Sequence, residues 1–250
     1  MFAVCVTGCS PVSSEGIIPL YILAGLKEEK MEKPEEMKDF FNSRAQTYDL
    51  HMLEELNLRE FYDAIAEYFP KGPPNAQILD IGCGTGLEIS NIFLSAPNAQ
   101  ITCIDISDKM LEKLLEKFKE KKDQLHIMCA SYFDVEYGFS KYDWAISTYS
   151  LHHFSPDSKL SLYKKIYNSL KPNAVYIEGD YTVRTKDKEV YFQKESERIR
   201  KANNISTGLY HYDTPLSNDT QIRLFLEAGF KIAEIRKQWD NTAVFTCVKI

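Results

Sequence analysis

Short apolar runs alternate with amphipathic segments between residues 76 and 178. In order along the chain, the expected strands are 76–81, 100–104, 125–129, 144–148 and 175–178, and the expected helices between them are 86–95, 108–122 and 155–170. Because strands and helices alternate, neighbouring strands are expected to be parallel, with helices on both faces of one sheet. The pattern therefore predicts a doubly wound α/β fold.

Two segments with helical spacing of apolar residues, 34–49 and 52–69, precede the first strand. A Gly/Pro cluster follows them and marks the entry to the sheet. We interpret residues 34–70 as cap helices. They open a single domain that extends over 34–250.

The end of the chain departs from the alternation. A charged helical segment at 186–202 belongs to what we interpret as a lid insertion at 182–213, and a further helix is expected at 216–228. The last two apolar runs, 230–237 and 243–249, are close enough to form a hairpin. We therefore expect a Rossmann-like sheet of seven strands, mostly parallel, with an antiparallel final strand.

The first 33 residues lack the basic start and continuous apolar centre of a signal peptide, because Pro11, Glu15 and Pro19 interrupt the apolar run. A membrane-spanning helix needs ~20 consecutive apolar residues, which this stretch does not supply. We expect residues 1–33 to be a poorly ordered extension, and the alternative is a lid segment over the site. No membrane association is expected.

Composition narrows the choice of partners and compartment. The 250 residues carry a net charge of −6, so the whole surface does not attract a phosphate backbone, although a local basic patch for RNA is still compatible with it. The six cysteines form no CxxC pair and no histidine lies at finger spacing, so no metal site is expected. Unpaired thiols in apolar runs indicate a reducing, cytoplasmic location.

A glycine turn, Gly82-Cys83-Gly84-Thr85-Gly86, lies between the first strand and its helix. Glycine lets a ligand approach the main chain, and ligands of such sheets bind at the carboxyl ends of strands. The spacing differs from that of dinucleotide sites and phosphate loops. Asp80 before the turn suits a ligand with an ammonium or sulfonium group. Asp105 ends the second strand, where it can accept both hydroxyls of a ribose or, alternatively, cap the next helix.

These runs resemble the motifs of class I S-adenosylmethionine-dependent methyltransferases. Residues 79–86 resemble the first motif, 103–107 the second and 142–154 the fourth, while 170–174 resemble the stretch before strand five; the likeness extends over about 37–249. It implies S-adenosyl-L-methionine as cofactor and S-adenosyl-L-homocysteine as product. It also implies in-line displacement of the methyl group by a nucleophilic acceptor.

The resemblance also implies roles for individual residues. The three glycines would line the cofactor, Asp80 would lie near its amino group, Asp105 would hold the ribose and Ile106 would cover the adenine. The third motif usually carries Gly-Asp, but Ser131 replaces the acid here. The remaining expected cofactor contacts are Tyr132, Ser147 of the fourth motif, and Arg44 and Tyr48 of a run similar to the cap helix of members acting on small molecules. Simple packing is the alternative for Tyr48.

The candidates for the acceptor side lie where the fourth and fifth strands end and in the segment 208–213. They are Tyr149, His152, Tyr181 and His211. A hydroxyl or thiol acceptor benefits from a base, and histidine and tyrosine can serve. The alternatives are that His152 and His153 only pack or cap, and that the aromatic residues of 208–213 form the core of a lid.

Three functions stay open from the sequence. The first is methylation of a small molecule by a monomer or homodimer. The second is a transferase reaction on tRNA, with the carboxylated cofactor as one form of it. Residues 197–204 and 226–230 are similar to transferases that carboxymethylate wobble uridine in tRNA with such a cofactor, and Arg198 or Arg200 would then have to bind its carboxylate. The third is a catalytically silent cofactor-binding protein.

Overall fold

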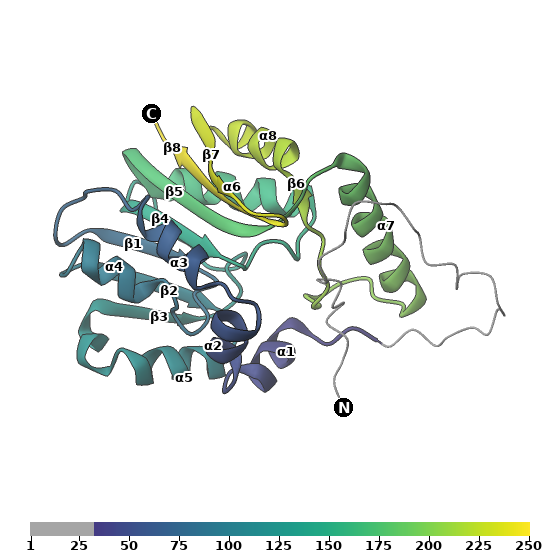
Figure 1. Ribbon diagram of the computed structural model, residues 1–250, viewed down its shortest axis with the longest axis horizontal. Helices are drawn as coiled ribbons and strands as arrows, with labels where there is room; N and C mark the ends of the chain where they lie inside the picture. Colours follow the sequence, from purple (N-terminus) through teal and green to yellow (C-terminus); the bar gives the residue numbers. More distant parts are fainter. Residues whose placement is uncertain (1–32) are drawn as a thin grey trace. The chain divides into compact units, whose positions relative to one another are not determined.

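One mixed sheet forms the centre of the computed structural model, which describes residues 33–250 (Figure 1). The expected extension at 1–33 lies, except for its last residue, outside the described residues. The strand order is β3-β2-β1-β4-β5-β8-β7, with the short β6 paired to β5. The strands are β1 Gln77–Ile81, β2 Gln100–Asp105, β3 Leu125–Cys129, β4 Tyr142–Thr148, β5 Leu170–Val183, β6 Leu216–Ser217, β7 Ile232–Gln238 and β8 Thr242–Val248.

The order and directions of the strands confirm the predicted sheet. β1 pairs in parallel with both β2 and β4, whereas β8 runs antiparallel to β5 and to β7. Strand order reverses between β1 and β4, so the carboxyl ends of these two strands form the edge at which ligands of such sheets bind. β5 is longer than the expected strand 175–178 at both ends, because Leu170 already pairs with Tyr142 of β4 and the last two residues, 182 and 183, pair with β6.

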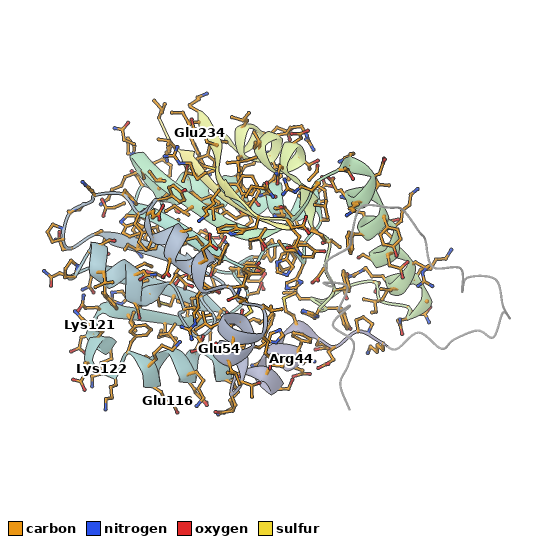
Figure 2. All side chains as sticks on the ribbon, viewed as in Figure 1. Arg44, Glu54, Glu116, Lys121, Lys122 and Glu234 are labelled. Atoms are coloured by element: carbon orange, nitrogen blue, oxygen red, sulfur yellow. The ribbon has the colours of Figure 1, made fainter. Side chains whose placement is uncertain are left out.

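Some helices precede the first strand, and the others connect the strands. They are α1 Met37–Arg44, α2 Tyr48–Leu50, the π-helix His51–Glu55, α3 Arg59–Ala66, α4 Ile89–Ser95, α5 Asp108–Lys117, the 3-10 helix Lys119–Gln124, α6 Pro156–Ser169, α7 Lys186–Ala202 and α8 Asn218–Ala228. Figure 2 shows Glu116 of α5 and Lys121 and Lys122 of the 3-10 helix at the periphery, where charge stays hydrated. Among the described helices, none has the length and apolarity that a bilayer crossing requires.

Side chains at the helix starts explain several boundaries. Ser107 accepts a hydrogen bond from the Met110 amide at the start of α5, and Ser155 accepts one from Ser158 at the start of α6. Both satisfy an amide that has no partner within its helix. At the other end of α8, Gly229 takes a φ of 116°, the left-handed conformation that closes many helices.

The single helix expected at 52–69 is wrong in its first half. The chain forms the π-helix His51–Glu55, breaks, and starts again as α3. Asn57 has a φ of 54° at the break, and Asn tolerates this left-handed conformation better than most residues. Periodicity alone does not reveal this break because the apolar spacing continues on both sides of it.

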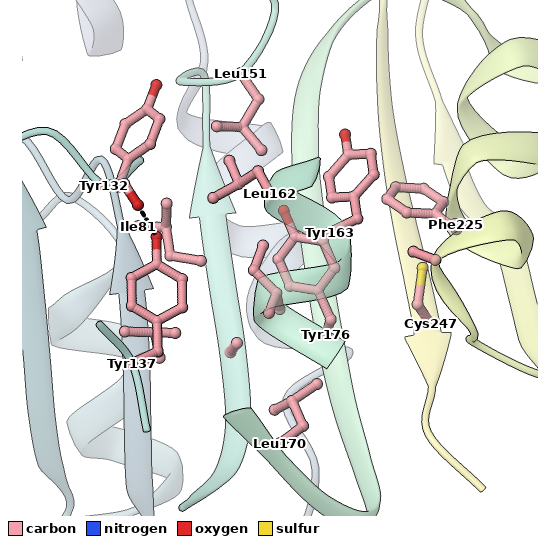
Figure 3. Close-up of a cluster of buried hydrophobic side chains, with 14 of the residues drawn as sticks. Ile81, Tyr132, Tyr137, Leu151, Leu162, Tyr163, Leu170, Tyr176, Phe225 and Cys247 are labelled. Atoms are coloured by element: carbon pink, nitrogen blue, oxygen red, sulfur yellow. Dashed lines mark hydrogen bonds between the residues drawn. The ribbon is translucent and has the colours of Figure 1, made fainter. Parts of the chain in front are cut away.

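Two apolar cores lie on the two faces of the sheet. α3, α4 and α5 supply the core that contains Ile78 of β1, while α6 and α8 supply the core that contains Leu79 and Ile81. The neighbouring positions of one strand therefore face opposite cores, as the pleat requires. Figure 3 shows part of the second core, in which the Tyr163 ring of α6 lies 4.7 Å from the Phe225 ring of α8.

Candidate functional site

The glycine turn follows β1 directly and exposes main chain to its neighbours. Gly82, Gly84 and Gly86 all have positive φ, at 68°, 50° and 73°. A methyl group built on Gly82 would lie 1.9 Å from Ser150 Oγ, and one on Gly84 would lie 3.9 Å from a ring carbon of Tyr48. The Ser150 side chain thus lies directly against Gly82, and a ligand that contacts the Gly82 main chain from this side must displace it, whereas Tyr48 is at ordinary contact distance from Gly84.

Asp105 is joined to the glycine turn through its carboxylate. One oxygen accepts a hydrogen bond of 2.9 Å from the Gly84 amide, and the other accepts one of 2.8 Å from the Ser107 amide. Burial raises the pKa of Asp105 to about 6, although the amide hydrogen bonds act in the opposite direction. Since an ionised carboxylate accepts about four hydrogen bonds, it retains capacity for two hydroxyls.

Asp80 is buried near the end of β1, and the Glu88 carboxyl is the hydrogen-bonding neighbour of its side chain within the described residues. Burial and the nearby Glu88 raise the pKa of Asp80 well above its usual range. Glu88 itself bonds Thr148 through one oxygen. Buried polar atoms are normally paired, so two buried acids with spare acceptor oxygens beside the glycine turn fit a cationic ligand group such as the amino group of S-adenosylmethionine.

The cap segment contacts the glycine turn at Tyr48 and Asp49. Asp49 accepts a hydrogen bond from the Thr85 hydroxyl and forms an ion pair of 2.6 Å with Lys117 of α5. Arg44 takes a different direction, because its guanidinium bonds Glu35 and lies 3.5 Å from the centre of the Phe40 ring. The structure therefore brings Tyr48 to the turn, whereas Arg44 is engaged by the cap segment itself.

The other expected cofactor contacts divide into two groups. Ile106 is partly buried near the turn, and the Tyr132 hydroxyl bonds the Ser150 carbonyl at 3.3 Å. Ser131 accepts a hydrogen bond from the Phe133 amide, which is a local turn contact. The structure corrects the expectation for Ser147. Its hydroxyl lies 2.8 Å from the Tyr176 hydroxyl, in the core that α6 and α8 supply. The alternation along β4 sends Ser147 to that face, so it is not part of the group around the turn.

A histidine cluster lies at the carboxyl ends of β4 and β5; we use this name for His152, His153, His211, Asp180 and Asp213. His152 Nδ1 lies 2.6 Å from Asp180, and its ring centre is 4.0 Å from that of His153. His153 Nδ1 lies 3.3 Å from Asp213, and the His153 and His211 ring centres are 4.7 Å apart. The cluster thus joins three segments that are far apart in the sequence.

Electrostatics differ among the three imidazoles. Burial lowers the pKa of His152, but the Asp180 carboxylate outweighs it, so the pKa lies above its usual value. Burial and the neighbouring His152 lower the pKa of His153. Burial and His153 lower the pKa of His211 to about 3. His153 and His211 are accordingly neutral at neutral pH and can accept as well as donate hydrogen bonds.

Two candidate tyrosines border this cluster. Tyr149 has a φ of 46°, uncommon for an aromatic residue, and its hydroxyl lies 2.6 Å from that of Thr242. Burial raises the pKa of the Tyr149 phenol. The ring centres of Tyr149 and Tyr181 lie 6.1 Å and 5.8 Å from that of His152. The structure therefore brings together all four residues expected on the acceptor side.

The sequence interpretation considered His153 together with His152, with packing or capping as the alternative, but it gave no role to Asp180 or Asp213. Asp180 precedes Tyr181 near the end of β5, and Asp213 lies two positions after His211. The available signal was an acid at the carboxyl end of a strand, near histidines. Only the fold shows that these acids point at the imidazoles.

Main-chain contacts hold the cap helix over the cluster. The Met37 amide bonds the Leu209 carbonyl, and the His211 amide bonds the Glu35 carbonyl. The Phe40 ring stacks on His211 with centres 3.4 Å apart. At the other side of α1, Asn42 accepts a hydrogen bond of 2.6 Å from the Ser107 hydroxyl. The cap therefore links the cluster to the turn that carries Asp105.

Comparisons with known proteins bear on the family of the chain. A family model described as a methyltransferase domain matches residues 78–173. The chain is 31% identical over 196 residues to the carboxy-S-adenosyl-L-methionine synthase of Helicobacter pylori, covering 72% of this chain and 77% of that protein. It is 30% identical over 146 residues to the malonyl-[acyl-carrier protein] O-methyltransferase of Priestia megaterium, covering 54% of this chain and 47% of that protein.

A solved structure extends the likeness to the fold. Human N-acetylserotonin methyltransferase in complex with S-adenosylmethionine superposes with a TM-score of 0.57 at 15% identity, covering 84% of this chain and 55% of that one. With the sheet order and the glycine turn, these likenesses show that the chain belongs to the class I S-adenosylmethionine-dependent methyltransferases, enzymes that use S-adenosylmethionine and release S-adenosylhomocysteine.

Proposed function

We propose that the chain methylates a small-molecule acceptor held between the glycine turn and the histidine cluster. The observation that carries this proposal is that the cap helix α1 and its flanking residues cover the histidine cluster. Phe40 of α1 lies on His211, and the segment 209–211 is bonded to residues 35–37. A covered, aromatic and histidine-rich site suits a compact acceptor better than a folded nucleic acid, which needs an open basic face.

On the cofactor side, the proposed contacts are the main chain of the glycine turn, Asp80, Asp105 and Ile106, with Tyr48 and Tyr132 at its margin. Bound S-adenosylmethionine supplies an electrophilic methyl group on a sulfonium. Asp80, together with Glu88, would face the amino group, and Asp105 would accept the ribose hydroxyls. These roles are supported by unsatisfied acceptor capacity at both acids.

On the acceptor side, the chain must align the nucleophile with the carbon–sulfur bond and exclude water. Tyr149, Tyr181 and His211 are the proposed contacts. Bound S-adenosylmethionine would supply the methyl group, and its sulfur would keep the electron pair of the carbon–sulfur bond. The proton of an acceptor O–H, S–H or N–H would pass to a nearby base, for which the imidazoles of the histidine cluster are the proposed groups.

The test combines an acceptor panel with one variant. Purified protein is incubated with labelled S-adenosylmethionine and phenols, thiols, amines, carboxylic acids or bulk tRNA. We expect label in a small molecule. We also expect His211→Gln to lower kcat/KM at least tenfold with cofactor affinity unchanged, while His126→Gln, which changes an exposed residue of β3, has no effect. Label in tRNA alone, or tight S-adenosylhomocysteine binding without any transfer, would overturn the proposal.

The name of the Helicobacter pylori relative favours one second candidate, formation of a carboxylated cofactor. That reaction requires a cationic group for the added carboxylate. Arg200 bonds the Tyr212 hydroxyl at 2.6 Å, next to Asp213, whereas Arg198 is paired with Glu195. Mass spectrometry of the cofactor that copurifies with the protein separates the two functions, because a retained carboxylated form would favour the second.

A further inference from the structure

The donor atoms of His152, His153 and Asp213 converge in a way that the cofactor site does not require. His152 Nε2 lies 3.6 Å from Asp213 Oδ1, His153 Nδ1 lies 3.3 Å from the same oxygen, and the three donor atoms lie within 4.8 Å of one another. Donors held about 2.1 Å from one tetrahedral zinc ion lie about 3.4 Å apart. We propose that these three residues bind a divalent transition-metal ion.

Asp180 provides the outer support that such a site needs. Its Oδ1 lies 2.6 Å from His152 Nδ1 and accepts the proton of that nitrogen, which leaves the Nε2 lone pair directed to the side of Asp213. Asp180 is itself fixed by the amides of Leu151 and Tyr181. A carboxylate that orients a metal-binding imidazole through its other nitrogen is the usual second layer of zinc sites.

Two carboxylates lie against the paired imidazoles of the cluster. Asp180 lies 2.6 Å from His152 Nδ1, Asp213 lies 3.3 Å from His153 Nδ1, and the two rings are 4.0 Å apart. A divalent cation between Asp213 and the two imidazoles would offset the negative charge of these acids. His153 Nδ1 also lies 3.3 Å from the Tyr212 carbonyl.

The donor set indicates the class of ion. Two imidazoles and one carboxylate suit zinc, iron(II), cobalt or manganese, whereas magnesium and calcium prefer oxygen donors. Three protein ligands leave a position for a further molecule, as in catalytic metal sites. His211 lies beside this position, with its ring 4.7 Å from that of His153.

The role of this metal site in catalysis rests on the proposed methyl transfer, whereas the binding of the metal does not. An acceptor hydroxyl or thiol bound to the open position would lose its proton more readily, because the ion stabilises the resulting anion. The acceptors expected from this geometry are hydroxyl or thiol compounds that can reach a metal, with a neighbouring oxygen favouring chelation. Metal binding itself needs neither acceptor nor cofactor, so it is tested separately.

The experiment uses full-length protein without a histidine tag, stripped with a chelator and titrated with Zn²⁺ by calorimetry. We expect one equivalent to bind, and His153→Gln and Asp213→Asn each to weaken binding at least 100-fold. His126→Gln, an exposed histidine on β3, should bind as the unaltered chain does. Circular dichroism of each metal-free variant checks its fold, and Asp213→Asn is suited to this because the Asp213 side chain is 41% exposed.

Cobalt(II) gives a second readout that is independent of activity. The visible absorption of cobalt(II) should become intense when the ion binds to the chain, which indicates four or five ligands including imidazole. This intense absorption should be absent when cobalt(II) is added to the His153→Gln variant. Absence of stoichiometric Zn²⁺ binding, or equal binding by both cluster variants, would overturn the metal site while leaving methyl transfer unaffected.

Discussion

At the residue scale, Asp105 combines two functions that are visible in its contacts. Its carboxylate holds the glycine turn through the Gly84 amide and holds the start of α5 through the Ser107 amide. Its pKa of about 6 places its titration within the range of ordinary buffers. The residue that shapes the turn is therefore also the one whose charge should control ribose binding.

We predict that affinity for S-adenosylhomocysteine falls as the pH is lowered through about 6. The protonated acid loses acceptor capacity for the ribose, so binding should weaken by up to tenfold per pH unit below that point. Calorimetry between about pH 8 and about pH 5 measures it. Asp105→Asn is the control: it should bind at least tenfold more weakly, and without this pH dependence. A flat profile for the unaltered chain would contradict the ribose role.

How far the sequence predicted the site depended on whether a residue's environment is local. Gly82 and Asp105 were predictable because a strand followed by a turn fixes their place by itself. Ser147 was assigned by its motif, yet the phase of β4 directs it to Tyr176 in the core. The partnership of His152 with Asp213 joins residues on different segments, and only the folded sheet brings them together.

At the element scale, one buried acid anchors α7. Glu189 accepts hydrogen bonds from the amide and hydroxyl of Ser217 and from the Thr220 hydroxyl, and it pairs with Lys186. These contacts join the start of α7 to the start of α8. The inserted helix is thus fixed at one end, although most of its length is charged. Periodicity predicted the helix but could not predict this anchor.

We predict that Glu189→Gln lowers the free energy of unfolding by about 2 to 3 kcal/mol at neutral pH. Burial alone would raise the pKa of Glu189, but the contacts with Lys186 and Ser217 lower this pKa to about 2. A depressed acid stabilises the fold above its unfolded pKa, and this contribution is lost as the pH falls from about 4.5 to about 2. Chemical denaturation checks the value. Glu195→Gln on the same helix is the control, and an equal loss there would contradict the anchor.

At the scale of the whole molecule, a buried polar network connects the sheet to α6 and α8 beneath the histidine cluster. Lys159 Nζ lies 3.3 Å from Glu178 and 3.8 Å from Asp180, and it donates to Gln221 at 2.9 Å. All four of these side chains are buried. Asp180 also bonds His152, so Lys159 of α6 is connected through Asp180 to the histidine cluster.

We predict that Lys159→Met destabilises the protein by about 3 kcal/mol or more, because it leaves two buried carboxylates without their cation. It should also weaken Zn²⁺ binding, since Asp180 loses one of the groups that fix it. Thermal and chemical unfolding measure the first effect. Lys171→Met, which removes a partly exposed pair with Asp143, is the control and should cost less than about 1 kcal/mol. Equal losses would contradict the network.

The central claim is that the cofactor binds at the glycine turn with its ribose on Asp105 and its sulfur directed to the histidine cluster. A crystal structure of the full chain with S-adenosylhomocysteine tests it most directly. The account predicts ribose hydroxyls on Asp105, an amino group near Asp80, and displacement of the Ser150 side chain from Gly82. A nucleoside bound elsewhere, with Ser150 still against Gly82, would contradict it.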